Sequence, residues 1–386
     1  MKRINRHMLL ATILIVVVIG GGIGVRVATG AHAAGAKTQC GGWSIVSSPN
    51  PTGIFHVLNG VAAVTPNNVW AVGDYYSTSQ SAYVSLIEHW TGANWQVVPS
   101  PSENYITNLN GITAISANDI WAVGSTEPAN SATGFTLIEH WDGTSWSIVP
   151  SPSPGQELNR LWAVSAGPSN DVWAVGDYST KNGRAFRTLI EHWDGTSWSV
   201  VPSPSPANFD TLYSVSVVKH TDQVWAVGDF VDSSDTNEVL IEHWKGSHWA
   251  RVSAPNNGAG ELFGVKAISP TNVWAVGGIS GQTLTEQWNG TSWSVVPSPS
   301  IGSTDFLLGV VSVAANDVWA VGVASDGSSS ETLTEQWNGT SWSIVTSPNV
   351  ASDRLNAISA VQTTGKLWSV GYSEENTKIT LTEFYC

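Results

Sequence analysis

The sequence predicts an all-β protein in which one unit of four strands recurs, and three observations support this prediction. The 386 residues include 21 Trp, 37 Gly and 18 Pro but only 12% charged residues. Such a composition is typical of short strands joined by tight turns, because exposed helices need more Lys and Glu. The phrase VWAVG, or a close variant, occurs seven times, and a Trp-rich hairpin follows most copies. The repeat therefore determines the predicted fold.

The spacing of the repeat predicts the architecture. The copies of VWAVG are separated by 51, 52, 52, 49, 45 and 49 residues, and they contain Trp70, Trp121, Trp173, Trp225, Trp274, Trp319 and Trp368. A period of this length is typical of one propeller blade. The sequence thus predicts a seven-bladed β-propeller with four antiparallel strands per blade.

Each unit contains four strand segments in the same order. The first is exemplified by LNGVAAV at residues 58–64, and a tight turn separates it from VWAVG at residues 69–73. A variable loop leads to LIEHW at residues 86–90, and a second tight turn leads to a fourth strand such as WSVVPSP at residues 198–204. Asp-Gly and Asn-Gly in these second turns favour hairpins with positive φ. The Pro-rich tail has few free amides and is expected to connect blades in an extended conformation.

The two ends of the chain supply the parts of one blade. The seventh unit stops at LTEFYC, residues 381–386, and lacks a fourth strand, whereas CGGWSIVSSPNP at residues 40–51 is a free copy of that strand. We therefore expect the N-terminal strand to complete the last blade and close the ring. Closure would also cover an otherwise bare strand edge.

Cys40 and Cys386 are the only cysteines, and the alignment of repeats puts them at adjacent positions of one hairpin turn. The sequence predicts a disulfide between them, which an exported protein would retain. On the chain-entropy model it would stabilise the fold by about 4 to 5 kcal/mol. The alternative is a pair of reactive thiols.

Residues 1–36 differ in kind from the repeats. A basic start precedes an uncharged, mostly apolar run of 18 residues, Met8 to Val25, and AHAAGA offers cleavage sites after Ala33 or Ala36. This pattern predicts a signal peptide, with the propeller at residues 37–386. A retained N-terminal membrane anchor is the alternative, because the run just reaches spanning length. Either reading places the propeller outside the cytoplasm, secreted or at the cell surface.

The charge balance argues against nucleic acid as a partner. Without the leader, 12 basic residues face 30 acidic ones, and nucleic-acid binding requires the opposite excess. The acidic residues are scattered through the sequence, so they are interpreted as a solubilising surface rather than an acidic binding patch.

The repeat resembles those of kelch-type propellers. VWAVGG at residues 273–278, a long variable loop and HWDGTSWSVVPSP at residues 192–204 carry the resemblance, which covers about residues 43–386. The second glycine is present only at Gly278. The unit is also similar to the Asp-box repeats of sialidases and photosystem assembly-factor propellers, although its turn is shorter. WD40 repeats share the Trp-Asp pairs of two units but have a shorter period. The resemblance implies a fold and no activity.

The third strand of every unit contains a glutamate, followed by histidine in four units and by glutamine in two. Such a ring could be read as a metal or acid-base centre. However, third strands of neighbouring blades would stand more than about 10 Å apart, judged from the strand spacing, and metal ligands must lie within about 2 Å of the ion. We therefore expect no metal site. The glutamates are expected to accept hydrogen bonds between blades or from Trp indoles, and the tryptophans to pack between blades.

No catalytic motif or cofactor-binding loop is present in the sequence, so a binding or scaffold protein without cofactor is favoured over an enzyme. The alternative is a glycan hydrolase or lyase, which would need two converging carboxylates. Its candidates lie in the connectors between blades: Asp210, Glu261, Asp305 and Asp353.

The loops divide the expected propeller into two faces. Connections between strands one and two, and between strands three and four, are short and alike. The loops between strands two and three and the connectors between blades vary, and they should emerge together on the other face, where binding residues are expected. There, three consecutive units place Trp162, Tyr213 and Phe263 near the channel. These rings could stack on a ligand or only fill gaps between inner strands. A protein or a cell-surface glycan is the expected partner of a monomer, and a membrane only if the leader is retained.

Overall fold

The computed structural model describes residues 41–101, 105–128, 133–180, 183, 185–255, 259–361 and 364–386. They belong to one compact unit, residues 39–386, and contain strands but no α-helix. A search of this part of the chain for an apolar helix long enough to span a membrane finds none. The predicted leader, residues 1–36, lies outside the described residues.

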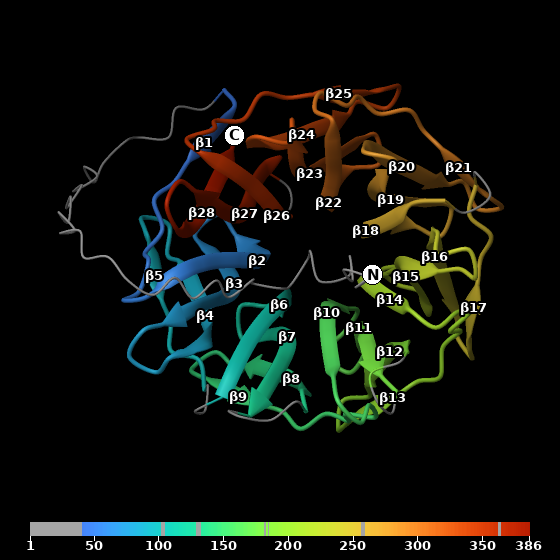
Figure 1. Ribbon diagram of the computed structural model, residues 1–386, viewed down its shortest axis with the longest axis horizontal. Helices are drawn as coiled ribbons and strands as arrows, with labels where there is room; N and C mark the ends of the chain where they lie inside the picture. The colour runs from blue at the N-terminus through green and yellow to red at the C-terminus, as the bar shows by residue number, and fades with distance from the viewer. Residues whose placement is uncertain are drawn as a thin grey trace, which may run out of the picture. The chain divides into compact units, whose positions relative to one another are not determined.

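In the described part of the chain, twenty-eight strands form seven sheets arranged as the blades of a ring (Figure 1). The inner strands of blades 1 to 7 are β2 (Ile54–Thr65), β6 (Tyr105–Ser116), β10 (Asn159–Ala166), β14 (Asp210–Val217), β18 (Glu261–Ser269), β22 (Thr304–Ala314) and β26 (Ser352–Val361). The second strands are β3 (Asn68–Ser77), β7 (Asp119–Pro128), β11 (Val172–Ser179), β15 (Gln223–Val231), β19 (Asn272–Ile279), β23 (Asp317–Ser325) and β27 (Lys366–Glu374).

The third strands are β4 (Ala82–Trp90), β8 (Phe135–Trp141), β12 (Phe186–Trp193), β16 (Asn237–Lys245), β20 (Gln282–Trp288), β24 (Ser330–Trp337) and β28 (Lys378–Tyr385). The outer strands have three residues each: β5 (Trp95–Val97), β9 (Trp146–Ile148), β13 (Trp198–Val200), β17 (Trp249–Arg251), β21 (Trp293–Val295), β25 (Trp342–Ile344) and β1 (Trp43–Ile45). All strands within a sheet pair antiparallel, which confirms the predicted fold class.

The N-terminal strand completes the last blade, as the sequence predicts. The seventh sheet has the order β1-β28-β27-β26, and Trp43 of β1 stands opposite Tyr385 of β28. Further backbone bonds extend the pairing: Gly41 N donates to Cys386 O at 2.9 Å, and Val46 N donates to Thr382 O at 2.9 Å. The seventh blade therefore has four strands, like the other six.

The repeated tryptophans hold neighbouring blades together. The ring of Trp70 in blade 1 packs against Trp141 and Trp146 in blade 2, with ring centroids 4.8 and 5.6 Å away. The same contact recurs around the ring, and at the closure Trp319 meets Tyr385 at 4.6 Å and Trp43 at 6.0 Å. Aromatic pairs of this geometry add to the area that they bury. The expected role of these tryptophans in packing is confirmed.

In blades 1, 2, 3 and 6 a polar residue at the start of the second strand accepts the indole N–H of the tryptophan in that strand. Asp119 Oδ1 accepts the indole N–H of Trp121 at 3.1 Å and lies 2.9 Å from His140 Nε2. In blade 6, Gln336 Nε2 takes the place of histidine and donates to Asp317 Oδ1 at 2.9 Å. Histidine and glutamine in the third strand thus make the same hydrogen bond to the residue at the start of the second strand. The indoles of these four blades bind these residues, and no indole hydrogen bond found among the described residues goes to a third-strand glutamate, so that part of the prediction is wrong.

Candidate functional site

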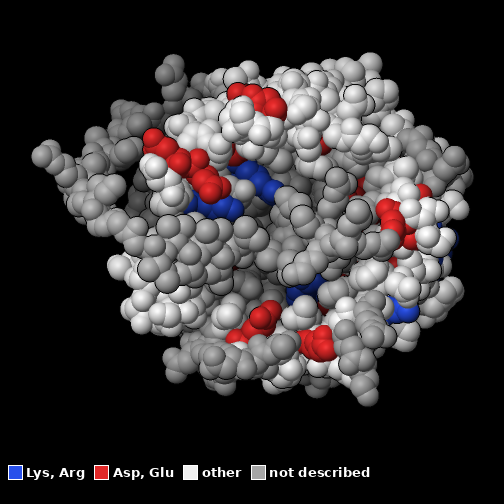
Figure 2. Space-filling model, in the orientation of Figure 1, with Lys and Arg blue, Asp and Glu red and all other residues white. Residues whose placement is uncertain are grey.

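The variable loops and the connectors meet on one face of the ring. A pocket of about 180 Å³ between blades 6 and 7 is lined by both, with Ser325 and Ser330 at the ends of the β23–β24 loop and Thr304 and Ser352 at the ends of connectors. We call this face, seen in Figure 2, the loop face. Basic side chains lie near its centre, with acidic side chains around them.

In three adjacent blades the inner strand is joined to the next by an asparagine latch. The side-chain amide of Asn356 donates to Leu58 O at 2.9 Å, that of Asn59 to Leu109 O at 3.1 Å, and that of Asn110 to Leu161 O at 2.9 Å. Each asparagine follows the first leucine of its inner strand. In these three blades the residue at this position therefore serves to connect neighbouring inner strands.

In blades 3 to 5 the same position carries the predicted aromatic residues, and the structure brings them together. The ring centroids of Trp162 and Tyr213 are 6.1 Å apart, and those of Tyr213 and Phe263 are 5.3 Å apart. Phe306 of blade 6 extends the row, 5.9 Å from Phe263. All four side chains are half-buried. We call these four residues the aromatic arc.

Phe306 is absent from the sequence prediction because it precedes the inner-strand leucine instead of following it. Its ring nevertheless reaches the same row. Trp162 can be recognised in the sequence by its position. All other tryptophans occupy one of three repeated positions, and Trp162 occupies none of them. A residue that departs from the repeat is not explained by the packing of the repeat.

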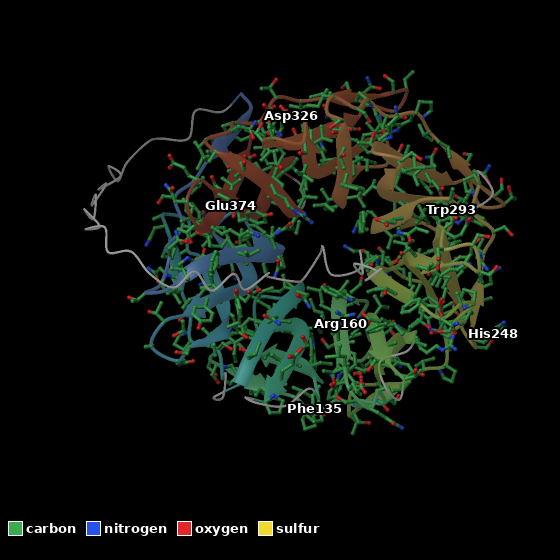
Figure 3. All side chains as sticks on the ribbon, in the orientation of Figure 1. Phe135, Arg160, His248, Trp293, Asp326 and Glu374 are labelled. Carbon is green, nitrogen blue, oxygen red and sulfur yellow. The ribbon has the colours of Figure 1, made fainter. Side chains whose placement is uncertain are left out.

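A buried carboxylate fixes one end of the arc. Asp177 accepts the indole N–H of Trp162 and a guanidinium N–H of Arg160, both at 2.7 Å. The Arg160 guanidinium lies 5.3 Å from the Trp162 ring centroid and 5.2 Å from that of Phe186, within range of a cation–π contact. Figure 3 shows Arg160 near the centre of the ring. This end of the arc is therefore fixed, and the Arg160 charge there is paired with the Asp177 carboxylate.

The middle of the arc lies in an acidic environment. Burial raises the pKa of the Tyr213 phenol well above its usual range, and the nearby Asp229 carboxylate raises it further. Burial also raises the pKa of Asp229 well above its usual range, with a further contribution from the charge of Glu261. Tyr213 therefore stays protonated, and its hydroxyl is hydrogen-bonded to the Asp229 side chain.

The carboxylates proposed for a glycan-cleaving enzyme hold the connectors instead. Asp210, Asp305 and Asp353 are fully buried. Asp210 Oδ1 accepts Ala207 N at 3.0 Å, Asp305 Oδ2 accepts Ile301 N at 2.6 Å, and Asp353 Oδ2 accepts Val350 N at 2.6 Å. Glu261 accepts the side-chain amide of Asn237. The first three carboxylates fix backbone turns in different blades, so they do not form a catalytic pair.

Comparison with solved structures identifies the fold. It is a seven-bladed β-propeller. YCF48 bound to D1 peptide matches with a TM-score of 0.56 and 14% identity, over 92% of this chain and 100% of that chain. YCF48 from Cyanidioschyzon merolae gives a TM-score of 0.54 at 15% identity, over 89% and 99% of the two chains. U3-55K gives a TM-score of 0.59 at 9% identity, over 89% and 98%.

No protein-family model and no curated protein sequence matches the chain. At these low identities the solved structures establish the fold alone, and the resemblance to kelch and Asp-box repeats stays a prediction.

The third-strand glutamates form a second set of buried acids. The seven side chains are at most 1% exposed: Glu88, Glu139, Glu191, Glu242, Glu286, Glu335 and Glu383. Glu139 accepts Ser100 Oγ at 2.9 Å, a bond between neighbouring blades as predicted. Both carboxyl oxygens of Glu242, Glu335 and Glu383, however, have no hydrogen-bond partner in the described part of the chain. Burial raises the pKa of Glu335 and Glu383 to about 8.

These glutamates form no site for a ligand, since they are covered on both sides by neighbouring blades. No group of three His, Cys, Asp or Glu side chains arranged to hold a metal ion occurs among the described residues.

The opposite face, formed by the short turns, is less uniform than the sequence suggested. Turns between the first and second strands have two residues in blades 1, 2, 5 and 6, such as 66–67, but five in blade 3 (167–171) and blade 4 (218–222). The expectation of short and alike turns is therefore wrong for these two blades. The extra residues could have been found by aligning the units at VWAVG.

Proposed function

We propose that the chain is an exported, non-catalytic binding protein that holds a segment of a partner protein on its loop face. The aromatic arc carries this proposal. In blades 7, 1 and 2 an asparagine at the same position suffices to join inner strands. The half-buried rings of blades 3 to 5 are therefore not required to close the ring, and they offer apolar area beside the Arg160 charge.

The chemistry of the arc suits an extended peptide. Half-exposed aromatic rings supply contact area with little loss of conformational freedom, and the Arg160 guanidinium can donate hydrogen bonds to backbone carbonyls. The similar structure of YCF48 bound to D1 peptide supports this choice, because it pairs a similar fold with a peptide ligand. Glycan binding at the same face is the competing outcome.

The test is to select peptides from a displayed random library on the folded protein and to measure their affinity for a variant with Trp162, Tyr213 and Phe263 changed to Ala. We expect at least a hundredfold loss of affinity in this variant, since buried aromatic contacts dominate such interfaces. Isothermal titration calorimetry would measure the change.

A matched control is Phe135→Ala, which removes a 42% exposed aromatic ring. Figure 3 shows Phe135 at the outer edge of the ring. This variant should bind like the unchanged protein. Equal affinity of the triple variant and the control would overturn the proposed role of the arc, as would a protein that selects no peptide.

Export and the disulfide are part of the same proposal. Cys40 lies outside the described residues, but its neighbour Gly41 bonds to the Cys386 carbonyl at 2.9 Å, which supports the predicted Cys40–Cys386 bond. The secreted protein should begin after Ala33 or Ala36 and be lighter by two hydrogens than its reduced form. Reduction should lower the melting temperature. Mass spectrometry that finds the leader retained, or two free thiols, would contradict this prediction.

A further inference from the structure

We propose that the face opposite the loop face carries a second site, between blades 3 and 4, that binds a neutral oligosaccharide. A pocket of about 860 Å³ lies there, lined by both five-residue turns and by Trp173, His192 and Trp244. Its volume is within the range of small-ligand sites. The inference goes beyond the proposed function, since it concerns other residues on the other face.

The turns that build this pocket are held in place by their own hydrogen bonds. In the blade 3 turn, Gly167 N donates to Asp171 O and Asp171 N donates to Pro168 O, both at 2.9 Å. In the blade 4 turn, Val218 O accepts Thr221 Oγ1 at 2.9 Å, and Val218 N donates to Gln223 O at 2.9 Å. A pocket whose walls are already ordered loses little entropy on binding.

One indole donor that lines the pocket is unused. In blades 1, 2 and 5 the last tryptophan of the third strand donates its N–H to the carbonyl of the first turn residue, at 3.1 to 3.2 Å. Trp244 occupies this position in blade 4, where its indole N–H has no partner in the described residues. The side chain is half-buried and lines the pocket. Its N–H is therefore available to a ligand.

An acceptor lies in the same pocket. Asp171 Oδ1 already receives the Trp173 indole at 2.8 Å and lies 2.9 Å from His192 Nε2. Its other oxygen lies over Gly167, where an added Cβ would come within 2.9 Å of it. This oxygen is left to accept from a ligand, and the absence of a side chain at Gly167 keeps the space open.

The mixture of groups favours a sugar over a charged ligand. The pocket is lined by Lys219 together with Asp171 and Asp222, so it has no excess of positive charge for an anion. Hydroxyl groups of a sugar can donate to the Asp171 carboxylate and accept from the Trp244 indole and Lys219. The apolar face of a sugar ring can pack against the exposed parts of Trp244 and His192.

The experiment titrates the folded protein with neutral gluco-, manno-, galacto-, xylo- and chito-oligosaccharides and compares variants by calorimetry. For a sugar that binds, Trp244→Phe and Asp171→Asn should each weaken affinity about tenfold, the cost of one lost hydrogen bond in a site. Asn is the natural residue at the equivalent positions 68 and 272, so Asp171→Asn should fold.

Blade 2 offers matched controls, because its short turn leaves the indole of Trp141 bonded to Ala117 O. Trp141→Phe and Asp119→Asn make the same chemical changes there and should leave affinity unchanged. The proposal is overturned if none of these sugars binds at millimolar concentration. It is equally overturned if the blade 2 variants weaken binding as much as the blade 4 and blade 3 variants do, or if only the arc variant does.

Discussion

Deleting residues 41–51 is expected to abolish the cooperative folding of the ring. This segment contains β1, whose Trp43 is 9% exposed and packs against Trp319 and Tyr385. Loss of a buried Trp side chain alone costs about 3 to 5 kcal/mol, a large part of the stability of a typical domain. The deletion would also bare the edge of β28, which invites association with other chains. Thermal unfolding followed by circular dichroism would measure the effect.

The control is to add a synthetic peptide of residues 41–51 to the truncated chain. This peptide should restore the transition, because β1 pairs with β28 through backbone bonds and Trp43. A peptide with Trp43→Ala should restore it poorly. A truncated chain that melts at the same temperature as the full one would show that closure by β1 does not stabilise the ring.

The buried glutamates should make the protein less stable as pH rises from neutral to alkaline. Burial raises the pKa of Glu335 from 4.5 to about 8, so the folded state holds a proton that the unfolded state has lost between these values. The free energy of unfolding therefore falls as pH rises through this window, and the contribution is complete below about 4.5. Each pKa unit corresponds to about 1.4 kcal/mol. The melting temperature should be lower at pH 8.5 than at pH 6.5.

The pKa of His243, which burial lowers to about 4, acts in the opposite sense only below about pH 6.5, so the two effects can be separated. Glu335→Gln should raise the free energy of unfolding at pH 8.5 by at least about 1 kcal/mol, since a buried charge no longer forms. Glu331→Gln on the same strand is exposed and should change little. A protein whose stability rises from pH 6.5 to 8.5 would contradict the argument.

The sequence was sufficient to predict the architecture because the same interactions recur in every blade. A strand with VWAVG must pack its tryptophan against the hairpin of the next blade, and seven copies fix the number of blades. The closing strand followed from the same repeat, since residues 40–51 could be aligned with an internal hairpin. Because the unit recurs, the strands and turns predicted in one copy could be checked against the other six copies.

The site was predictable only in part, because it depends on contacts between different blades. Trp162, Tyr213 and Phe263 could be found as departures from asparagine, but Phe306 joins them only through the geometry of the ring. The bond of Asp177 to Trp162 and Arg160 likewise depends on how an inner strand pairs with its neighbour. The five-residue turns of blades 3 and 4 were visible in the sequence, whereas the pocket between them required their folded shape.

We propose that the loop face binds a peptide through the aromatic arc. Hydrogen exchange of the protein with and without a selected peptide would locate the binding surface. We expect slower exchange at the starts of β10, β14 and β18, with no change in the turns of the opposite face. Protection confined to those turns, or to the outer strands, would contradict it.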